Sequence, residues 1–142
     1  MESLWKKNKH ADRTKAQAPQ KVRLAADIKS DYDVIVVGTD PEGVTAAVSA
    51  ARNGLKTLMI DGNNRKILGG LMTLGWLNTI DLNEDRDKPH IGGVQVLNKG
   101  LFSEWFKKVE GDSFDVNTAA NAFNEMVGNE KNIDVALGLK KL

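Results

Sequence analysis

Two glycines stand five residues apart where a short apolar run gives way to a helix-forming segment. The stretch is Gly38-Thr39-Asp40-Pro41-Glu42-Gly43. A glycine-rich turn between a strand and a helix binds a pyrophosphate, because its backbone N–H groups point at the anion and the helix dipole adds about half a positive charge. The dinucleotide-binding pattern has glycine at its first, third and sixth positions. Gly38 and Gly43 fill the first and last positions, and Asp40 occupies the middle one.

Asp40 departs from this pattern, since it puts a carboxylate where the backbone should approach a phosphate. Two like charges about 4 Å apart at an effective dielectric near 20 repel by about 4 kcal/mol, which is an upper bound here. Rotation of the Asp40 side chain to cap the following helix would lower this cost, because its oxygens would then face backbone N–H groups. We therefore expect Asp40 to be the N-cap whether or not a dinucleotide binds.

Asp61 directly follows the apolar run Leu58-Met59-Ile60. In dinucleotide-binding units an Asp or Glu about 20 residues after the glycine turn accepts hydrogen bonds from the adenosine ribose. Strand, turn, helix, strand and acid occur here in the required order, which a chance pair of glycines would not supply. Taken alone, Asp61 would be a turn residue at a strand end. Because it follows this series of elements, we expect it to bind the ribose.

The hydrophobic pattern predicts the elements that position these residues. Residues 33–37 form a β-branched run suited to a strand buried on both faces, and residues 57–60 form a second one. Between them, Pro41 at the first helical position and Asn53-Gly54 at the end predict a helix. Six of the chain's thirteen glycines lie in residues 62–93, so we expect mostly loop there.

The C-terminal part of the chain predicts two helices and a strand. Residues 98–109 carry an aromatic and aliphatic stripe at helical spacing, which is typical of a core rather than of a cofactor site. Residues 116–127 form the second helix with Asp115 as its cap, and residues 133–137 form the strand. Right-handed crossovers place the three strands in parallel in the order third–second–first. The predicted fold is α/β, a truncated Rossmann-like βαβ(α)αβ half of a doubly wound parallel sheet.

Composition excludes several classes of protein. The chain has 142 residues and a formal net charge of +1, which gives no reason to expect nucleic acid as a partner. No apolar run approaches the roughly 20 residues of a membrane-spanning helix. The absence of cysteine excludes disulfides and thiolate metal sites, and no cluster of His and carboxylates indicates a metal. We expect His10 and His90 to be solvated, so the catalytic residues stay unknown.

We expect two parts, a basic disordered tail over residues 1–30 and a partial dinucleotide-binding domain over residues 31–142. Residues 1–23 hold seven Lys and Arg against two acidic residues and lack the apolar middle of a secretory signal. A cytoplasmic protein is therefore expected. Ala16-Gln17-Ala18 has the small–x–small pattern of a cleavage site, so a lost or misassigned signal peptide before Ala18 stays open.

Residues 32–38 together with Pro41-Glu42-Gly43-Val44 resemble the N-terminal signature of FAD-dependent oxidoreductases. Residues 68–75 are similar to the Gly-Gly segment that those flavoproteins carry after the ribose-binding acid, near the flavin end of the cofactor. The resemblance is specific over residues 31–75 and loose to Leu137. It implies FAD as the cofactor, bound by nine residues: Gly38, Asp40, Pro41, Glu42, Gly43, Asp61, Gly69, Gly70 and Thr73.

The resemblance implies the FAD-binding N-terminal portion of a flavin-dependent oxidoreductase. It would be incomplete as a catalyst, because full-length relatives continue with the second half of the Rossmann domain and a substrate domain. One alternative is a non-catalytic Rossmann-like binding or interaction module that has lost the cofactor, which Asp40 and the short length favour. Another is an NAD-binding module of a larger assembly, against which the Gly-Gly segment argues.

The predicted strand order leaves residues 34–37 at an open edge of the sheet. Their sequence Val-Ile-Val-Val carries no lysine or proline to discourage pairing with another strand. In a complete doubly wound domain this strand is central, with a neighbour on each side. We therefore expect the edge to be paired by a second copy in a homo-oligomer, by the missing C-terminal half, or by residues 22–26 of the tail.

Overall fold

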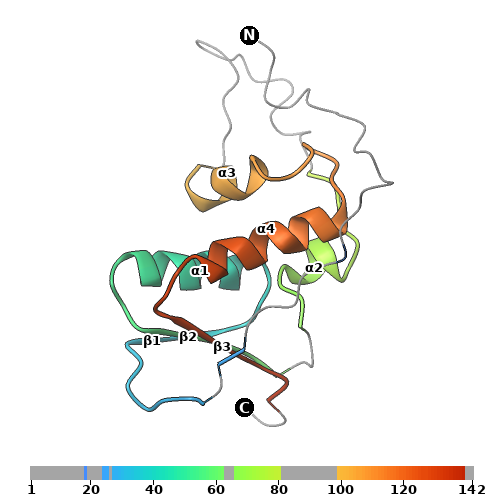
Figure 1. Ribbon diagram of the computed structural model, residues 1–142. Helices are drawn as coiled ribbons and strands as arrows, with labels where there is room; N and C mark the ends of the chain where they lie inside the picture. Colours follow the sequence, from blue (N-terminus) through green and yellow to red (C-terminus); the bar gives the residue numbers. More distant parts are fainter. Residues whose placement is uncertain (1–17, 19–23, 26, 63–65, 81–98, 140–142) are drawn as a thin grey trace.

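The computed structural model describes residues 18, 24–25, 27–62, 66–80 and 99–139. Figure 1 shows a small sheet with helices α1 and α4 on one side of it, and α3 on the far side of those helices from the sheet. In chain order the elements are β1 (Val34–Val37), α1 (Pro41–Arg52), β2 (Thr57–Asp61), α2 (Gly70–Thr73), α3 (Leu101–Phe106), α4 (Val116–Gly128) and β3 (Ile133–Leu137).

The three strands form one parallel sheet in the order β1-β2-β3. Val34 lies beside Thr57, which in turn lies beside Ile133, so each crossover returns the chain to the same end of the sheet. The predicted α/β fold, a Rossmann-like half with parallel strands in the order third–second–first, is confirmed.

The core lies between the sheet and the helices. Small residues of α1, including Val44, Ala47 and Val48, are completely buried and allow this helix to lie close to the strands. Above them Trp105 of α3 stacks on Phe123 of α4 with ring centroids 5.1 Å apart. Trp105 is only 2% exposed, so the aromatic stripe belongs to the core, as predicted.

Helix α4 agrees with the prediction to within one residue, whereas α3 is shorter than predicted. Gly100, with φ 66° and ψ −134°, has a non-helical backbone, so α3 begins at Leu101. After Phe106 the amide of Lys108 donates to the carbonyl of Trp105, three residues back, and the α-helical pattern stops there. The predicted first residue, Asn98, lies outside the described residues. The short helix α2 lies in the region where mostly loop was expected.

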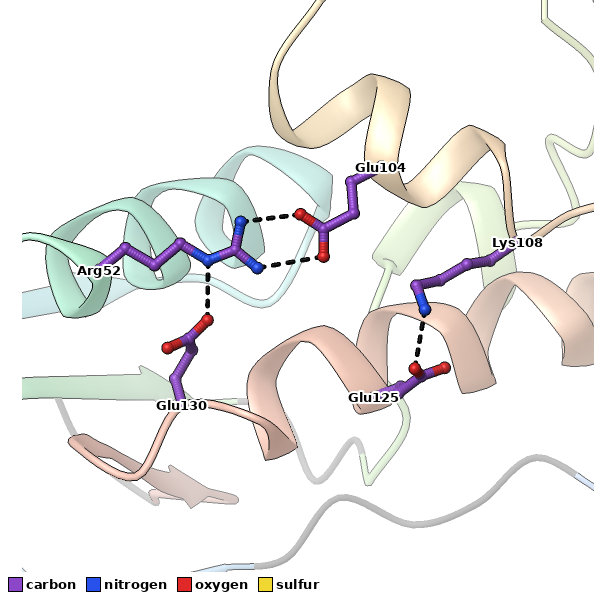
Figure 2. Close-up of polar contacts among 5 residues, drawn as sticks. All are labelled: Arg52, Glu104, Lys108, Glu125 and Glu130. Atoms are coloured by element: carbon purple, nitrogen blue, oxygen red, sulfur yellow. Dashed lines mark hydrogen bonds and ion pairs between the residues drawn. The ribbon is translucent and has the colours of Figure 1, made fainter.

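Ion pairs join the helices at the end of α1 that lies away from the glycine turn (Figure 2). Arg52 forms two hydrogen bonds with Glu104 of α3, at 2.7 and 3.0 Å, and a third with Glu130 after α4 at 2.8 Å. Lys108 pairs with Glu125 of α4 at 2.7 Å. The Arg52 guanidinium lowers the pKa of the Glu104 carboxyl. These contacts hold α3 against the other two helices.

The face of the sheet opposite the helices is exposed at β1. Ile35 and Val37 are 59% and 67% exposed, so the prediction that β1 is buried on both faces is wrong among the described residues. The reason is that α1 and α4 cover one face only (Figure 1). Strand β2, which lies between two neighbours, is buried along its whole length, as predicted.

Strand β1 is an edge strand of the described sheet, as predicted. The described part of the tail meets the opposite edge, because the Ala25 N–H donates to the Val135 carbonyl of β3 at 2.8 Å. Pairing of β1 by residues 22–26 is therefore contradicted at Ala25, while positions 22, 23 and 26 lie outside the described residues. No helix in the described ranges is long and apolar enough to cross a membrane.

Candidate functional site

The glycine turn joins β1 to α1 at the carboxyl end of the sheet. Gly38 has φ 122°, a conformation that side chains rarely permit, and its N–H donates to the Ile60 carbonyl at 2.8 Å. A Cβ atom at Gly43 would collide with the carbonyl oxygen of Gly38. Both glycines are therefore required for the tight path of this turn, as their spacing predicted.

Asp40 occupies the N-cap position of α1 with extended backbone angles of −67° and 170°. Its side chain makes no cap hydrogen bond, so the prediction that its oxygens face the helix amides is wrong. The carboxylate lies against Gly70, where a Cβ atom would collide with Asp40 Oδ1. The absence of a side chain at Gly70 leaves this space to the Asp40 carboxylate.

Thr39, which the sequence did not single out, connects three segments of the site. It is only 1% exposed, and its hydroxyl donates to Asp61 Oδ2 at 2.7 Å. Its carbonyl accepts the N–H of Gly69 at 2.8 Å. Its position as a hydroxyl residue directly after the first glycine was the available sequence signal.

Asp61 is the last residue of β2 and is 7% exposed. Its backbone carbonyl accepts the N–H of Gly138 at 2.9 Å, which ties the end of β2 to the end of β3. Its carboxylate bonds Thr39 of the glycine turn. The structure therefore brings the predicted ribose-binding acid and the predicted phosphate turn together, at neighbouring strand ends.

The Gly-Gly segment begins α2 and packs against the turn. Gly69 and Gly70 have positive φ angles of 96° and 43°. A Cβ atom at Gly69 would meet the ring of Phe123, so this glycine allows α2 to approach α4 closely. The Thr73 hydroxyl donates to the Leu68 carbonyl at 2.8 Å and is buried, so it stabilises the start of α2.

The remaining predicted residues lie in the first turn of α1. Pro41 is the first helical residue, and Glu42 is exposed with its backbone carbonyl accepting the Thr45 hydroxyl at 2.9 Å. Binding of a cofactor by any of the nine predicted residues stays a prediction. His10 and His90 lie outside the described residues.

Exposed apolar side chains surround α2. Leu71, Leu74 and Leu77 are 59%, 42% and 50% exposed, and Trp76 is 72% exposed with a positive φ of 59°. Trp76 and Leu74 line a hollow of about 190 Å³ with Thr73 and residues of α4. An apolar surface of this kind beside the Gly-Gly segment is typical of a region that contacts another group or chain.

Comparison with known proteins identifies a family for this chain. The family described as FAD dependent oxidoreductase matches residues 33–140. The matched region includes the glycine turn, Asp61, the Gly-Gly segment and all three strands.

Individual relatives match either about half of this chain or a longer part at lower identity. Pseudooxynicotine dehydrogenase of Pseudomonas sp is 41% identical over 66 residues, which is 46% of this chain and 12% of the relative. Fumarate reductase (cytochrome) of Shewanella frigidimarina is 28% identical over 123 residues, 79% of this chain and 22% of the relative. Thioredoxin reductase of Bacillus subtilis (strain 168) is 43% identical over 68 residues, 48% and 19% respectively. The chain thus spans 12% to 22% of the length of these curated relatives.

Proposed function

The chain belongs to the family of FAD-dependent oxidoreductases, and from that premise we propose that it forms the FAD-binding N-terminal portion of such an enzyme, incomplete by itself as a catalyst. FAD is the cofactor of the family. One observation carries the proposal: the first turn of α1, which Asp40 does not cap, stands beside the Asp61 carboxylate, with Thr39 bonded between them.

These residues fit the adenosine diphosphate part of FAD. The close contact of Gly43 with Gly38 keeps the turn tight. The pyrophosphate would lie at the helix N-terminus that follows, because backbone N–H groups at such a terminus point at an anion. Asp61 would accept hydrogen bonds from the ribose hydroxyls, and Gly69-Gly70 would face the flavin side. The flavin supplies the hydride or electron transfer when it is bound, and the chain supplies its binding and orientation.

The described residues hold no evident acid–base pair beside the turn, so further catalytic groups are expected from additional polypeptide. The chain spans 12% to 22% of its curated relatives, and in the described sheet β1 has a neighbouring strand on one side alone. The N–H groups of Val34 and Gly38 donate to the carbonyls of Lys56, directly before β2, and of Ile60 in β2. The backbone groups of Ile35 and Val37 therefore point away from β2, toward the side on which we propose that another strand pairs.

FAD titration of the purified protein tests the cofactor site. We expect the parent to bind FAD and become yellow, and Asp61→Ala to weaken binding by roughly 1.5–3 kcal/mol, the value of hydrogen bonds to a charged group. The matched control is Asp134→Ala, because Asp134 lies on β3 and also accepts a hydroxyl, that of Tyr32 at 2.8 Å. Equal affinities for Asp61→Ala and the parent would rule out the ribose role. A parent that binds no FAD would instead favour the module that has lost its cofactor.

Sedimentation velocity and hydrogen exchange over residues 33–37 test the sheet edge. We expect the parent to form an oligomer, or to associate with the remainder of the flavoprotein, with slow exchange at Ile35 and Val37. Val37→Lys should weaken that association, since a lysine on an edge strand discourages pairing. A monomer with fast exchange at these two amides would contradict the proposed pairing.

A cytoplasmic location stays a prediction that cell fractionation can check.

A further inference from the structure

Thr39 is polar, buried and placed between the two parts of the proposed cofactor site. Its hydroxyl donates to the Asp61 carboxylate, and its carbonyl accepts from Gly69. The other buried threonines differ in this respect. The hydroxyls of Thr57 and Thr73 donate to backbone carbonyls, those of Leu55 and Leu68.

We infer that Thr39 is a positioning residue for ribose recognition: its hydroxyl fixes the rotation of the Asp61 carboxylate, and its carbonyl fixes the Gly-Gly segment beside the same turn. This inference rests on the proposed binding of FAD. It assigns to this chain a residue outside the glycines and the acid of the general dinucleotide-binding pattern.

The direction of the bond follows from chemistry. The Thr39 hydroxyl is the donor and Asp61 Oδ2 the acceptor, so the single hydroxyl proton of Thr39 points at Asp61. Threonine is branched at Cβ and has restricted χ1 freedom, so a buried threonine presents its hydroxyl in one direction. The 2.7 Å separation is that of a well-formed O–H···O hydrogen bond. Thr39 therefore holds the carboxylate oriented before a ligand arrives, which lowers the ordering cost of binding.

The oriented Asp61 carboxylate would accept a hydrogen bond from a ribose hydroxyl. Loss of the Thr39 hydroxyl should therefore weaken the binding of nucleotides that carry this ribose hydroxyl and leave the binding of those that lack it unchanged. ADP and 2′-deoxy-ADP are suitable probes, because they differ only at the ribose 2′ position that the acid recognises. A role of Thr39 in folding alone would affect both nucleotides equally.

The experiment is calorimetric titration of ADP and 2′-deoxy-ADP into four variants, each also followed by thermal unfolding. Thr39→Val and Thr39→Ala remove the hydroxyl, with and without preserved side-chain volume. Thr39→Ser keeps the hydroxyl, and Thr57→Val removes an equally buried hydroxyl from the opposite end of β2.

We expect Thr39→Val and Thr39→Ala to bind ADP about tenfold more weakly than the parent, with 2′-deoxy-ADP changed less than about twofold. Thr39→Ser should restore ADP binding, and Thr57→Val should leave it unchanged. In an Asp61→Ala background, Thr39→Val should have no further effect on ADP.

Two results would overturn the inference alone: equal losses for both nucleotides, or unchanged ADP binding in folded Thr39→Val or Thr39→Ala. If the parent binds FAD and ADP and the variants give either result, the proposed function stays intact. A parent that binds neither would overturn the proposed function and, with it, the positioning role of Thr39.

Discussion

Helices α1 and α4 both begin after an aspartate, yet the two aspartates act differently. Asp115 Oδ1 accepts the N–H groups of Asn117 and Thr118 at 2.8 and 3.2 Å, so the start of α4 is capped. Asp40 makes no such bond, and its carboxylate lies against Gly70 instead. The same residue at the same helix position therefore caps one helix and leaves the other without a side-chain cap.

The surroundings of each aspartate explain the difference. Beside Asp115, the carboxylate of Glu110 accepts the Asp115 N–H at 3.1 Å and the Thr118 hydroxyl at 2.8 Å. Carboxylates of the protein itself therefore accept the hydrogen bonds at the start of α4. Beside Asp40 stands Gly70, which offers space where a side chain would be. The first site stabilises the fold, and the second is where we propose that the pyrophosphate binds.

The strongest loss is expected at one of two glycines, one on each helix. Gly43→Ala places a Cβ atom against the Gly38 carbonyl, whereas a Cβ atom at Gly128, the last residue of α4, meets open space. We expect Gly43→Ala to cost about 1–3 kcal/mol in the free energy of unfolding and to abolish measurable FAD binding. Gly128→Ala should be neutral or stabilising by up to about 1 kcal/mol, with FAD affinity unchanged. Urea unfolding and FAD titration measure both. Parent-like FAD affinity in Gly43→Ala would show that the turn does not contact the cofactor.

The two aspartates themselves give the next effect. Asp115→Ala removes a cap and should cost about 1 kcal/mol in the free energy of unfolding, within a range of about 0.5–2 kcal/mol. Asp40→Ala removes no cap hydrogen bond, so we expect the part of its loss that comes from capping to be only a few tenths of a kcal/mol. Thermal unfolding of both variants measures the difference. Equal losses would mean that Asp40 caps α1 in solution after all.

A smaller effect concerns the charge of Asp40 near the proposed pyrophosphate. Asp40→Gly removes a carboxylate from the turn and should tighten FAD binding by about three- to tenfold at low salt, because like charges repel. Asp40→Asn, which keeps the shape and removes the charge, should act in the same direction. At high salt the gain should shrink, since exposed charges are screened. Weaker FAD binding in Asp40→Gly would mean that Asp40 assists the cofactor, for example through a bound cation.

Local sequence patterns predicted most of the fold, and contacts between distant segments decided the rest. The β-branched runs, the Asn53-Gly54 stop and the Asp115 cap depend on neighbours within a few residues, so strands and long helices were predicted nearly residue by residue. The rotation of Asp40 depends on Gly70, thirty positions later in the chain, and the role of Thr39 depends on Asp61. A pattern of neighbouring residues does not predict these contacts between distant positions. The exposure of Ile35 and Val37 was missed because their composition is that of a central strand.

A weaker effect is expected at the other end of α1, where ion pairs rather than glycines fix the helix. Glu104 and Arg52 are partly exposed, with side chains 36% and 40% accessible, so their pair should contribute only about 0.2–1 kcal/mol to the free energy of unfolding at pH 7. Glu104→Gln should lose that amount. Glu125→Gln, which removes the single contact with Lys108, is the control for general effects of lost surface charge.

The pH dependence separates the Arg52 pair from such general effects. Hydrogen bonds from Arg52 lower the pKa of Glu104 in the folded protein, so its contribution is fully present above the unfolded pKa of about 4.3. It is lost as the pH falls through the lower, folded pKa, because the carboxylate is then protonated in both states. The free energies of unfolding of the parent and Glu104→Gln, measured in urea, should therefore differ most at pH 7, and the difference should shrink as the pH falls below about 4.3. A difference that does not shrink with falling pH would mean that Glu104 holds α3 through packing rather than through its charge.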